Sequence, residues 1–230
     1  MFSLFGEPLP WVSHAEHLDH TLHEDVTMDL DARRKRAAYI DKTSEIRESF
    51  NFAHPNQIMK AAQVYSSDAY GFMLYDFSSQ TSQSYFKSWN TFVKLAWDVP
   101  RETYTYIVEN VLAENFDSLR KQIYTRYVTF FQNLFTSASK EVRHLARIVS
   151  QDPRSTVYKN VMMIQEASGL SPWDFSKARI KEKILKAPVP PNNDWRMSLL
   201  PKFLDFRREK EIQMEDTKAI TKMIDSLCST

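Results

Sequence analysis

The chain has very little glycine, and this shortage excludes several common sites. Only three glycines occur in 230 residues, at positions 6, 71 and 169. Gly-x-Gly-x-x-Gly turns and Walker-type loops need several glycines, because the backbone must approach phosphate closely. A Gly-x-Ser-x-Gly nucleophile elbow is missing as well. The sequence therefore excludes the usual nucleotide-binding loops and the hydrolase elbow.

Cysteine and long hydrophobic runs are scarce too. Cys228 is the only cysteine, so the sequence excludes an internal disulfide and a cysteine-based zinc site. One cysteine fits a reducing compartment, and we expect an intracellular location, nuclear or cytoplasmic. No apolar run approaches the roughly 18 residues of a membrane span, and the amino terminus lacks a signal-peptide pattern. We therefore expect no membrane partner.

What is abundant favours packed helices. The hydrophobic share is 43% and the aromatic share 13%, which suits a globular core. Few glycines and many Ala, Leu, Lys, Glu, Gln and Arg residues favour helix. We predict a mainly α fold, an irregular multi-helix bundle preceded by a short N-terminal β-hairpin or extended segment. The predicted parts are residues 1–26 (β segment), 27–187 (helical body) and 188–230 (proline-led linker and charged helical tail).

Apolar spacing assigns particular residues to the core. Pro55 and Ser155 each open a predicted helix, Asp117 looks like an N-cap, and Gly169 closes the helix from Ser155. In the helix that begins near Thr27, the predicted apolar face starts with Ala37, Ala38 and Ile40, and Asp29 and Asp31 suit the helix start. Helical spacing also favours core packing over base stacking for four aromatic residues: Tyr65, Tyr70, Trp89 and Trp97.

Four of the six histidines are spaced three residues apart, at 14, 17, 20 and 23. On a strand, alternate faces would separate His14 and His20 from His17 and His23. At most two could then share one metal ion, and Glu24 or Asp25 would have to complete the site. A polar, His-rich hairpin explains the same residues, so we predict no metal site and no cofactor.

The charge is uneven along the chain. The whole chain has a net charge of +1, but residues 1–116 carry −6 and residues 117–230 carry +7. A basic surface attracts phosphate. A salt-bridged helical surface would show the same composition, so charge alone leaves both interpretations open.

Basic clusters are the best candidate binding residues. Arg33, Arg34 and Arg36 span just over one helical turn, so at least two must be exposed or bind phosphate. Lys140, Arg143 and Arg147 form an i, i+3, i+7 stripe opposite Val142, Leu145 and Val149, which would suit a phosphate track. A solvated helix face would have the same spacing. The complete set of candidate nucleic-acid-binding residues is Arg33, Arg34, Arg36, Arg101, Arg120, Lys121, Arg126, Lys140, Arg143 and Arg147.

Several short motifs follow one another in a suggestive order. The tract from Trp11 to Asp25 contains His17-Leu18-Asp19-His20-Thr21-Leu22 and precedes the basic run Arg33-Arg34-Lys35-Arg36. Further motifs are Ala61-Ala62-Gln63-Val64-Tyr65 through Tyr70-Gly71, Leu74-Tyr75, Trp89-Asn90-Thr91 with Lys94-Leu95, Val99-Pro100-Arg101, Arg143–Ala146 and Asp152-Pro153-Arg154-Ser155-Thr156. In this order they resemble the end of the palm, the thumb and the post-thumb region of non-LTR (LINE-type) retrotransposon reverse transcriptases. The resemblance covers about residues 7–175.

The resemblance implies a function without catalysis. The family's catalytic aspartates should precede this region, so the chain is expected to be a non-catalytic C-terminal fragment rather than an enzyme. It would bind an RNA or DNA template–primer through the nucleic-acid backbone, and the palm domain of a longer polyprotein would be a further partner. The first segment would correspond to the primer grip, with His17, Leu18 and His20 as grip residues. Asp19 stands where the family has glycine, and a carboxylate there would repel the phosphates of the primer end.

A second function fits the same sequence. The modest net charge and the aromatic content also suit a helical protein–protein interaction module, repurposed from such an element or unrelated to it. An exposed apolar or aromatic patch would favour the interaction module, whereas a continuous basic groove would favour nucleic-acid binding.

Overall fold

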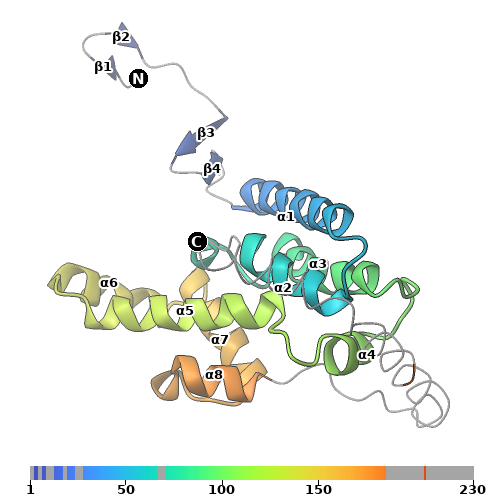
Figure 1. The fold of residues 1–230 in the computed structure, drawn as a ribbon. Helices are drawn as coiled ribbons and strands as arrows, with labels where there is room; N and C mark the ends of the chain where they lie inside the picture. The colour runs from blue at the N-terminus through green and yellow to red at the C-terminus, as the bar shows by residue number, and fades with distance from the viewer. Residues whose placement is uncertain are drawn as a thin grey trace.

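The computed structural model describes residues 3–4, 7–8, 13–17, 20–23, 28–66, 71–184 and 205. Most of these residues are helical, which confirms the predicted mainly α, multi-helix fold (Figure 1). The helices are α1 (Asp29–Ser49), α2 (Pro55–Tyr65), η1 (Phe72–Leu74), α3 (Gln80–Ala96), α4 (Thr105–Ile107), the π-helical turn η2 (Val108–Leu112), α5 (Leu119–Thr136), α6 (Lys140–Val149), α7 (Thr156–Ser168), η3 (Pro172–Asp174) and α8 (Lys177–Lys183).

Four short strands precede α1. The strand β1 (Ser3–Leu4) pairs antiparallel with β2 (Glu7–Pro8), and β3 (His14–His17) pairs antiparallel with β4 (His20–His23). In the second pair His14 lies opposite His23, and His17 lies opposite His20. The predicted linker and charged helical tail, residues 188–230, lie outside the described residues, apart from Asp205.

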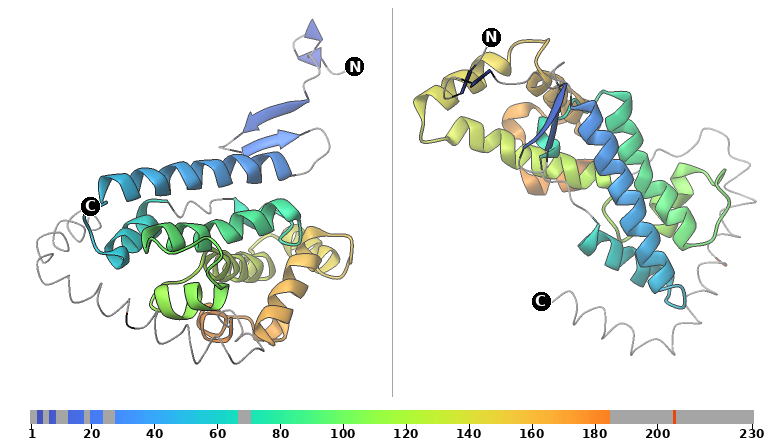
Figure 2. Two further views of the ribbon diagram at one scale, coloured as in Figure 1. Left: turned by 90° about the vertical axis from the view of Figure 1, so that its right-hand side faces the viewer. Right: turned by 90° about the horizontal axis from the view of Figure 1, so that it is seen from above.

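The helix α3 lies in the middle of the fold, with α1 on one side and α5 on the other. The rings of Tyr39 on α1 and Tyr85 on α3 are 5.7 Å apart, and Arg47 Nε donates to the carbonyl of Leu95 at 3.1 Å. From the first contact to the second, the sequence advances from 39 to 47 along α1 and from 85 to 95 along α3. The two helices therefore run in the same direction, as Figure 2 shows. On its other side, Phe86 of α3 meets Tyr124 of α5, with ring centroids 6.0 Å apart.

Aromatic rings fill the space between these helices. Phe72 and Phe77 are fully buried, and the loop that carries them connects α2 to α3. Of the four aromatic residues that the sequence assigned to the core, Trp89 and Trp97 are buried, as predicted. The prediction for Tyr65 was wrong, since this side chain at the end of α2 is 46% exposed. Tyr70 lies outside the described residues.

Serine hydroxyls begin most of the later helices. The hydroxyls of Ser79, Ser118, Ser139 and Ser155 each accept a hydrogen bond from a backbone N–H of the first helical turn. Such a bond pairs a donor that the helix itself leaves unsatisfied. The predicted N-cap at Asp117 was therefore wrong by one residue. Asp117 instead forms an ion pair with Lys121 at 3.1 Å.

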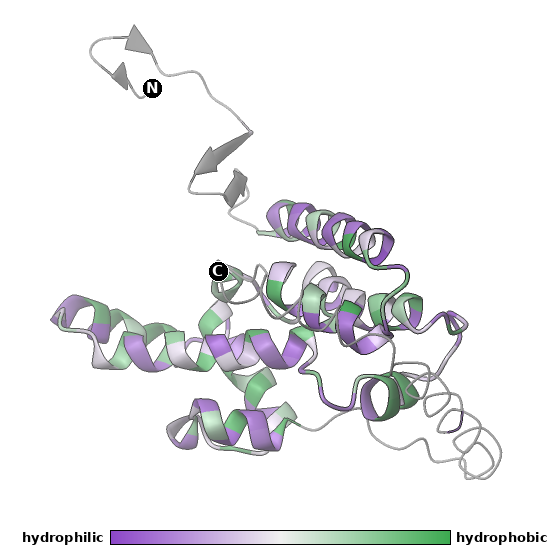
Figure 3. Cartoon of the chain, viewed as in Figure 1, coloured by the Kyte–Doolittle hydropathy of each residue, from purple (hydrophilic) through white to green (hydrophobic). Residues whose placement is uncertain are grey.

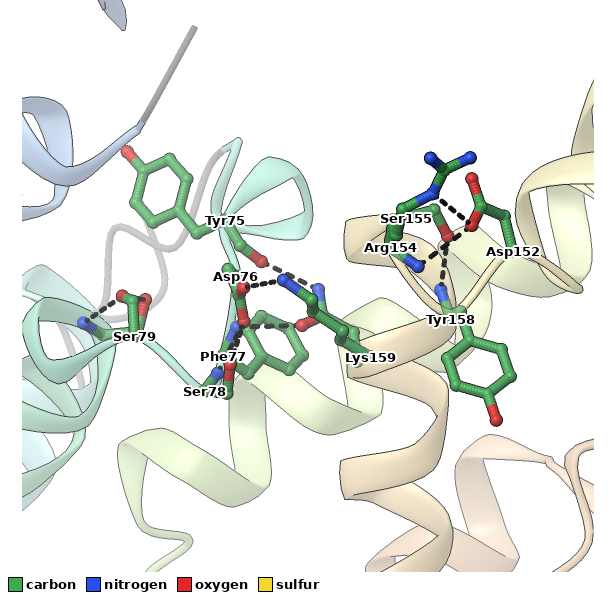
Figure 4. A network of polar contacts seen from close by, with 12 residues as sticks. Tyr75, Asp76, Phe77, Ser78, Ser79, Asp152, Arg154, Ser155, Tyr158 and Lys159 are labelled. Atoms are coloured by element: carbon green, nitrogen blue, oxygen red, sulfur yellow. Dashed lines mark hydrogen bonds and ion pairs between the residues drawn. The ribbon is translucent and has the colours of Figure 1, made fainter. Parts of the chain in front are cut away.

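One buried amide connects α7 to the loop before α3, which Figure 4 shows with Tyr75, Phe77 and Lys159 labelled. Asn160 is completely buried; its Nδ2 donates to the carbonyl of Tyr75 at 2.7 Å, and its Oδ1 accepts from the N–H of Phe77 at 2.8 Å. The side chain pairs with the loop as a neighbouring strand would, using one donor and one acceptor. This contact joins segments more than eighty residues apart and holds Phe77 in the core.

Beside this amide, Asp76, Ser78 and Lys159 form a partly exposed polar cluster. The carboxyl group of Asp76 should make the stability of the fold depend on pH. Partial burial would raise the pKa of Asp76, but hydrogen bonds from Ser78 and the ammonium of Lys159, 3.2 Å away, outweigh it and lower the pKa. A carboxyl group with a lowered pKa in the folded state stabilises the fold above its unfolded pKa of about 3.9, and that stabilisation is lost as the pH falls through the folded value.

Acid should therefore destabilise the wild-type chain more than the Asp76→Asn variant. Urea unfolding at pH 6 and at pH 3 measures this difference. Lys159→Gln should remove part of the same pH dependence, because it deletes the cation and keeps the carboxylate. An equal loss of stability in wild type and Asp76→Asn would contradict the prediction.

Candidate nucleic-acid interface

The helix α1 buries a face that its apolar pattern does not indicate. The buried residues are Asp31, Ala32, Lys35, Tyr39 and Thr43, and the predicted apolar face of Ala37, Ala38 and Ile40 is exposed. The prediction of that face was therefore wrong.

A polar contact is the reason. Asp31 is completely buried, and the hydroxyl of Tyr75 donates to its Oδ2. Burial, and then the bond to Asp31, raise the pKa of Tyr75, so this residue stays a neutral donor at neutral pH. Since a buried carboxylate needs partners, the side of α1 that carries Asp31 must face the core. Asp31 was predicted to be a helix-start charge, and the structure adds this second role.

The charged side chains of α1 fall mainly on two exposed sides of the helix. Successive residues of an α-helix are about 100° apart. On that spacing the basic residues Arg33, Arg36 and Arg47 share one side of α1 with Asp29, Ile40 and Ser44. We call this side the basic strip. All of its members are exposed in the structure.

The neighbouring exposed side of α1, about 100° around the helix from the basic strip, is mainly acidic. Asp41, Glu45 and Glu48 lie there on the same spacing, and Arg34 lies with them. The sequence predicted Arg33, Arg34 and Arg36 as one cluster, and all three are exposed. Helical spacing nevertheless puts Arg34 about 100° from Arg33 and about 200° from Arg36.

The basic strip borders a groove between α1 and α3. The groove holds a cavity of about 80 Å³ lined by Arg36, Ile40, Thr43, Ser44, Arg47, Ser88, Thr91, Phe92 and Leu95. A larger hollow of about 420 Å³ follows at the carboxyl end of α1 and shares two lining residues, Arg47 and Leu95, with the first. The bond from Arg47 Nε to Leu95 holds this guanidinium at the junction of the two hollows.

The smaller hollow has the chemistry of an anion site, because Arg36 and Arg47 line it and none of its lining residues is acidic. Glu48 and Asp98 also line the larger hollow. Guanidinium groups bind phosphate oxygens in a planar, two-pronged geometry. Arg36 and Arg47 are eleven residues apart, which is about 16 Å along a helix at 1.5 Å per residue. That span covers several phosphates of one strand, since phosphates follow one another every 3.4 Å or so along the duplex axis. The walls at Ile40 and Leu95 are apolar and partly exposed.

The remaining candidates are spread over other elements. Arg101 is exposed in the turn after α3, and its carbonyl accepts from Lys94 Nζ at 2.5 Å. Arg126 is exposed on α5. Arg120 is exposed and lies over the Phe86 ring, 5.8 Å from its centroid. Lys121 is half-buried in its ion pair with Asp117, so it is committed to an internal contact.

The side of α6 that carries the predicted phosphate track is not fully exposed, in contrast to the prediction. Arg143 is half-buried, and its Nη1 donates to the carbonyls of Ser137 and Ala138, the latter at 3.0 Å. Lys140 and Arg147 are exposed as predicted, but Leu145, expected in the core, is 59% exposed. Figures 1 and 2 place α6 beyond α5, away from α1, so its cations do not extend the basic strip.

The primer-grip residues are largely outside what the structure describes. His17 and His20 are paired positions of β3 and β4, where only the backbone is described, and Leu18 lies outside the described residues. Within the described part of the chain, no group of three or more His, Cys, Asp or Glu residues could hold a metal ion. In the same part, no helix has the length and hydropathy needed to cross a membrane.

The fold and the groove define a mainly α-helical protein with a charge-segregated helix at its surface. No family model, curated protein or solved structure matches the chain. Sequence patterns missed two features of the site, the burial of Asp31 and the groove itself.

Proposed function

We propose that this chain is a non-catalytic, thumb-like portion of a LINE-type reverse transcriptase and binds template–primer nucleic acid through its backbone. The observation that supports the proposal is the basic strip: Arg33, Arg36 and Arg47 are exposed on one side of α1, beside a groove. Arginine on a helix beside a groove positions a nucleic acid by its phosphates without reading its sequence. In this proposal the β3–β4 hairpin, which directly precedes α1, adjoins the palm domain of a longer polyprotein.

Binding should depend on salt and on the basic strip. We expect the affinity for a labelled RNA–DNA primer–template to fall as salt rises, with a slope of about 0.9 for each phosphate contacted. Replacing Arg33, Arg36 and Arg47 together by alanine should weaken binding and lower the slope by about two to three, because up to three phosphate contacts are lost. Fluorescence anisotropy across a salt series measures both quantities.

A charge-matched control separates a local site from net charge. Replacing Arg154, Lys177 and Lys183 by alanine also removes three exposed cations, but from residues outside α1. This variant should change the slope by less than about one. Equal effects of the two triple variants would mean that binding follows net charge alone. A folded wild-type chain that does not bind at low salt would overturn the proposed function.

A second candidate function is a helical protein–protein interaction module. One observation favours it: α6 presents three large aliphatic side chains to solvent, more than any other helix within residues 28–66 and 71–184. Contiguous exposed apolar residues often mark a binding surface.

A further inference from the structure

The helix α6 is amphipathic, but much of its apolar side faces away from the core. Ala146 is buried and Val149 half-buried, whereas Val142, Leu145 and Ile148 are 37%, 59% and 53% exposed. We call these last three residues the α6 ridge. Figure 3 shows hydrophobic and hydrophilic residues side by side on this helix, at one end of the molecule.

Contacts at both ends of α6 hold it in this orientation. At its amino end Arg143 donates to the last carbonyls before the helix, and the Ser139 hydroxyl accepts from the N–H of Val142 at 3.2 Å. At its carboxyl end the hydroxyl of Ser155 donates to the carbonyl of Val149. Turning the helix to bury Leu145 would break these bonds and expose Ala146. The ridge is therefore a stable feature of the surface.

Charges beside the ridge indicate what kind of partner fits it. Lys140, His144 and Arg147 are exposed and lie along the side of α6 next to Ile148 on helical spacing. Arg154, in the turn that follows, has a 91% exposed side chain and forms an ion pair with Asp152 at 3.3 Å. A partner that covers the ridge would bring acidic groups close to these cations.

Glu141 distinguishes a protein partner from an anionic membrane. On helical spacing it lies between Leu145 and Ile148, at the ridge itself. The Ser139 hydroxyl donates to its Oε2 at 2.6 Å and lowers the pKa of the carboxyl, so Glu141 stays charged. An anionic lipid surface would repel this carboxylate and remove its water. A helix can place a basic side chain opposite it, so the charge pattern favours a helix.

We propose that the α6 ridge docks an amphipathic helix of a partner protein, apolar along one face and acidic along the flank that meets Lys140 and Arg147. This inference rests on the second candidate function and names the surface and the partner chemistry. Helices pack with axes 8–10 Å apart, which lets the partner reach all three ridge residues. Because the ridge is small, affinity is expected to be weak, on the order of 10 μM or weaker.

The test uses the full chain and a synthetic peptide. The peptide is about 20 residues long, enough to form a helix, with leucines at i, i+3, i+4 and i+7, glutamates along the flank that meets Lys140 and Arg147, and one lysine placed opposite Glu141. A companion peptide has lysine in place of each glutamate. Amide chemical shifts of the labelled chain should move around α6 with the acidic peptide and far less with the basic one. Leu145→Glu/Ile148→Glu should weaken binding by tenfold or more.

A matched variant controls for added charge. Val64→Glu/Leu74→Glu replaces two side chains of similar exposure, 49% and 54%, on α2 and η1, and it should leave peptide binding within about twofold. All four positions are exposed, so circular dichroism should show intact folds. Both variants should keep the wild-type affinity for the primer–template. Peptide binding and primer–template binding are therefore measured separately, and either proposal can fail without the other.

Three outcomes would overturn the ridge proposal. The first is peptide binding that Leu145→Glu/Ile148→Glu leaves unchanged, or no binding of the acidic peptide at all. The second is binding to vesicles of anionic phospholipid that the ridge variant abolishes, which would assign the ridge to a membrane surface. The third is self-association of the wild-type chain that the ridge variant abolishes, which would make a second copy the occupant.

Discussion

Replacing Phe77 by alanine should lower the free energy of unfolding by about 4 kcal/mol. Phe77 is fully buried, and its ring lies within 5.2–6.4 Å of four other aromatic rings, measured between centroids. Those rings belong to Phe72, Phe86, Tyr124 and Tyr127, so they come from the loop itself, from α3 and from α5. Alanine would leave a cavity at the point where these elements meet, and rigid rings collapse poorly into a cavity.

Urea unfolding followed by circular dichroism measures this loss. For a chain of this size it corresponds to a fall in Tm of about 8–16 °C. Phe52→Ala is the matched control, because Phe52 is 65% exposed; it should change stability by no more than about 0.5 kcal/mol. A loss below about 1 kcal/mol for Phe77→Ala would mean that Phe77 is not at the centre of the core.

Replacing Asn160 by alanine should cost about 3 kcal/mol. The change removes two buried hydrogen bonds and leaves the carbonyl of Tyr75 and the N–H of Phe77 without the amide that pairs them. An unpaired buried polar group costs about 1–3 kcal/mol, so two such groups outweigh the small gain in helix propensity from alanine. The expected fall in Tm is about 6–12 °C.

Two further variants test the cause. Asn133→Ala, at an exposed position of α5, should change stability by less than about 0.5 kcal/mol. Asn160→Asp keeps an acceptor for the N–H of Phe77 but loses the donor to Tyr75 and adds a buried charge, so it should cost at least as much as Asn160→Ala at neutral pH. A stability close to wild type for Asn160→Asp would contradict the paired-amide geometry.

These scaffold contacts matter for the proposed nucleic-acid interface. The loop held by Asn160 also carries Tyr75, whose hydroxyl binds Asp31 and fixes the rotation of α1. Two hydrogen bonds therefore link Asn160 on α7, through Tyr75, to Asp31 on α1. Loss of Asn160 should affect the position of α1 as well as overall stability, and the primer–template measurement on Asn160→Ala should be made at a temperature where the variant remains folded.

The helices and most of their ends could be predicted from the sequence. Ser139 and Ser155 begin helices where their side chains can accept backbone N–H bonds, and Gly169 ends α7 with a φ of 67°, which glycine adopts without strain. These are local effects of a few neighbouring residues. The one-residue error at Asp117 has the same local origin, since Asp117 and Ser118 are both good caps.

The faces of α1 and α6 could not be predicted in the same way. Periodicity shows that a helix is amphipathic, but it does not show what covers each side. On α1, Asp31 is buried and accepts a hydrogen bond from Tyr75, forty-four residues away in the sequence. Ile40 lies on another side of the helix and is left exposed. On α6, Arg143 binds carbonyls of the preceding turn and thereby leaves Leu145 in solvent.

By itself, the sequence determined that the chain is mainly helical and where its helices begin and end, because propensity, serine caps and glycine act over one or two turns. Only the tertiary structure decided which side of each helix is exposed, because that depends on buried polar groups finding partners far away in the chain. Arg34 and Arg36 lie two residues apart in one basic run, yet they occupy different sides of α1. Helix geometry alone separates these two arginines, because residues two apart are about 200° apart. The tertiary structure decided that the side of α1 carrying Asp31 is buried, which leaves the sides of both arginines exposed.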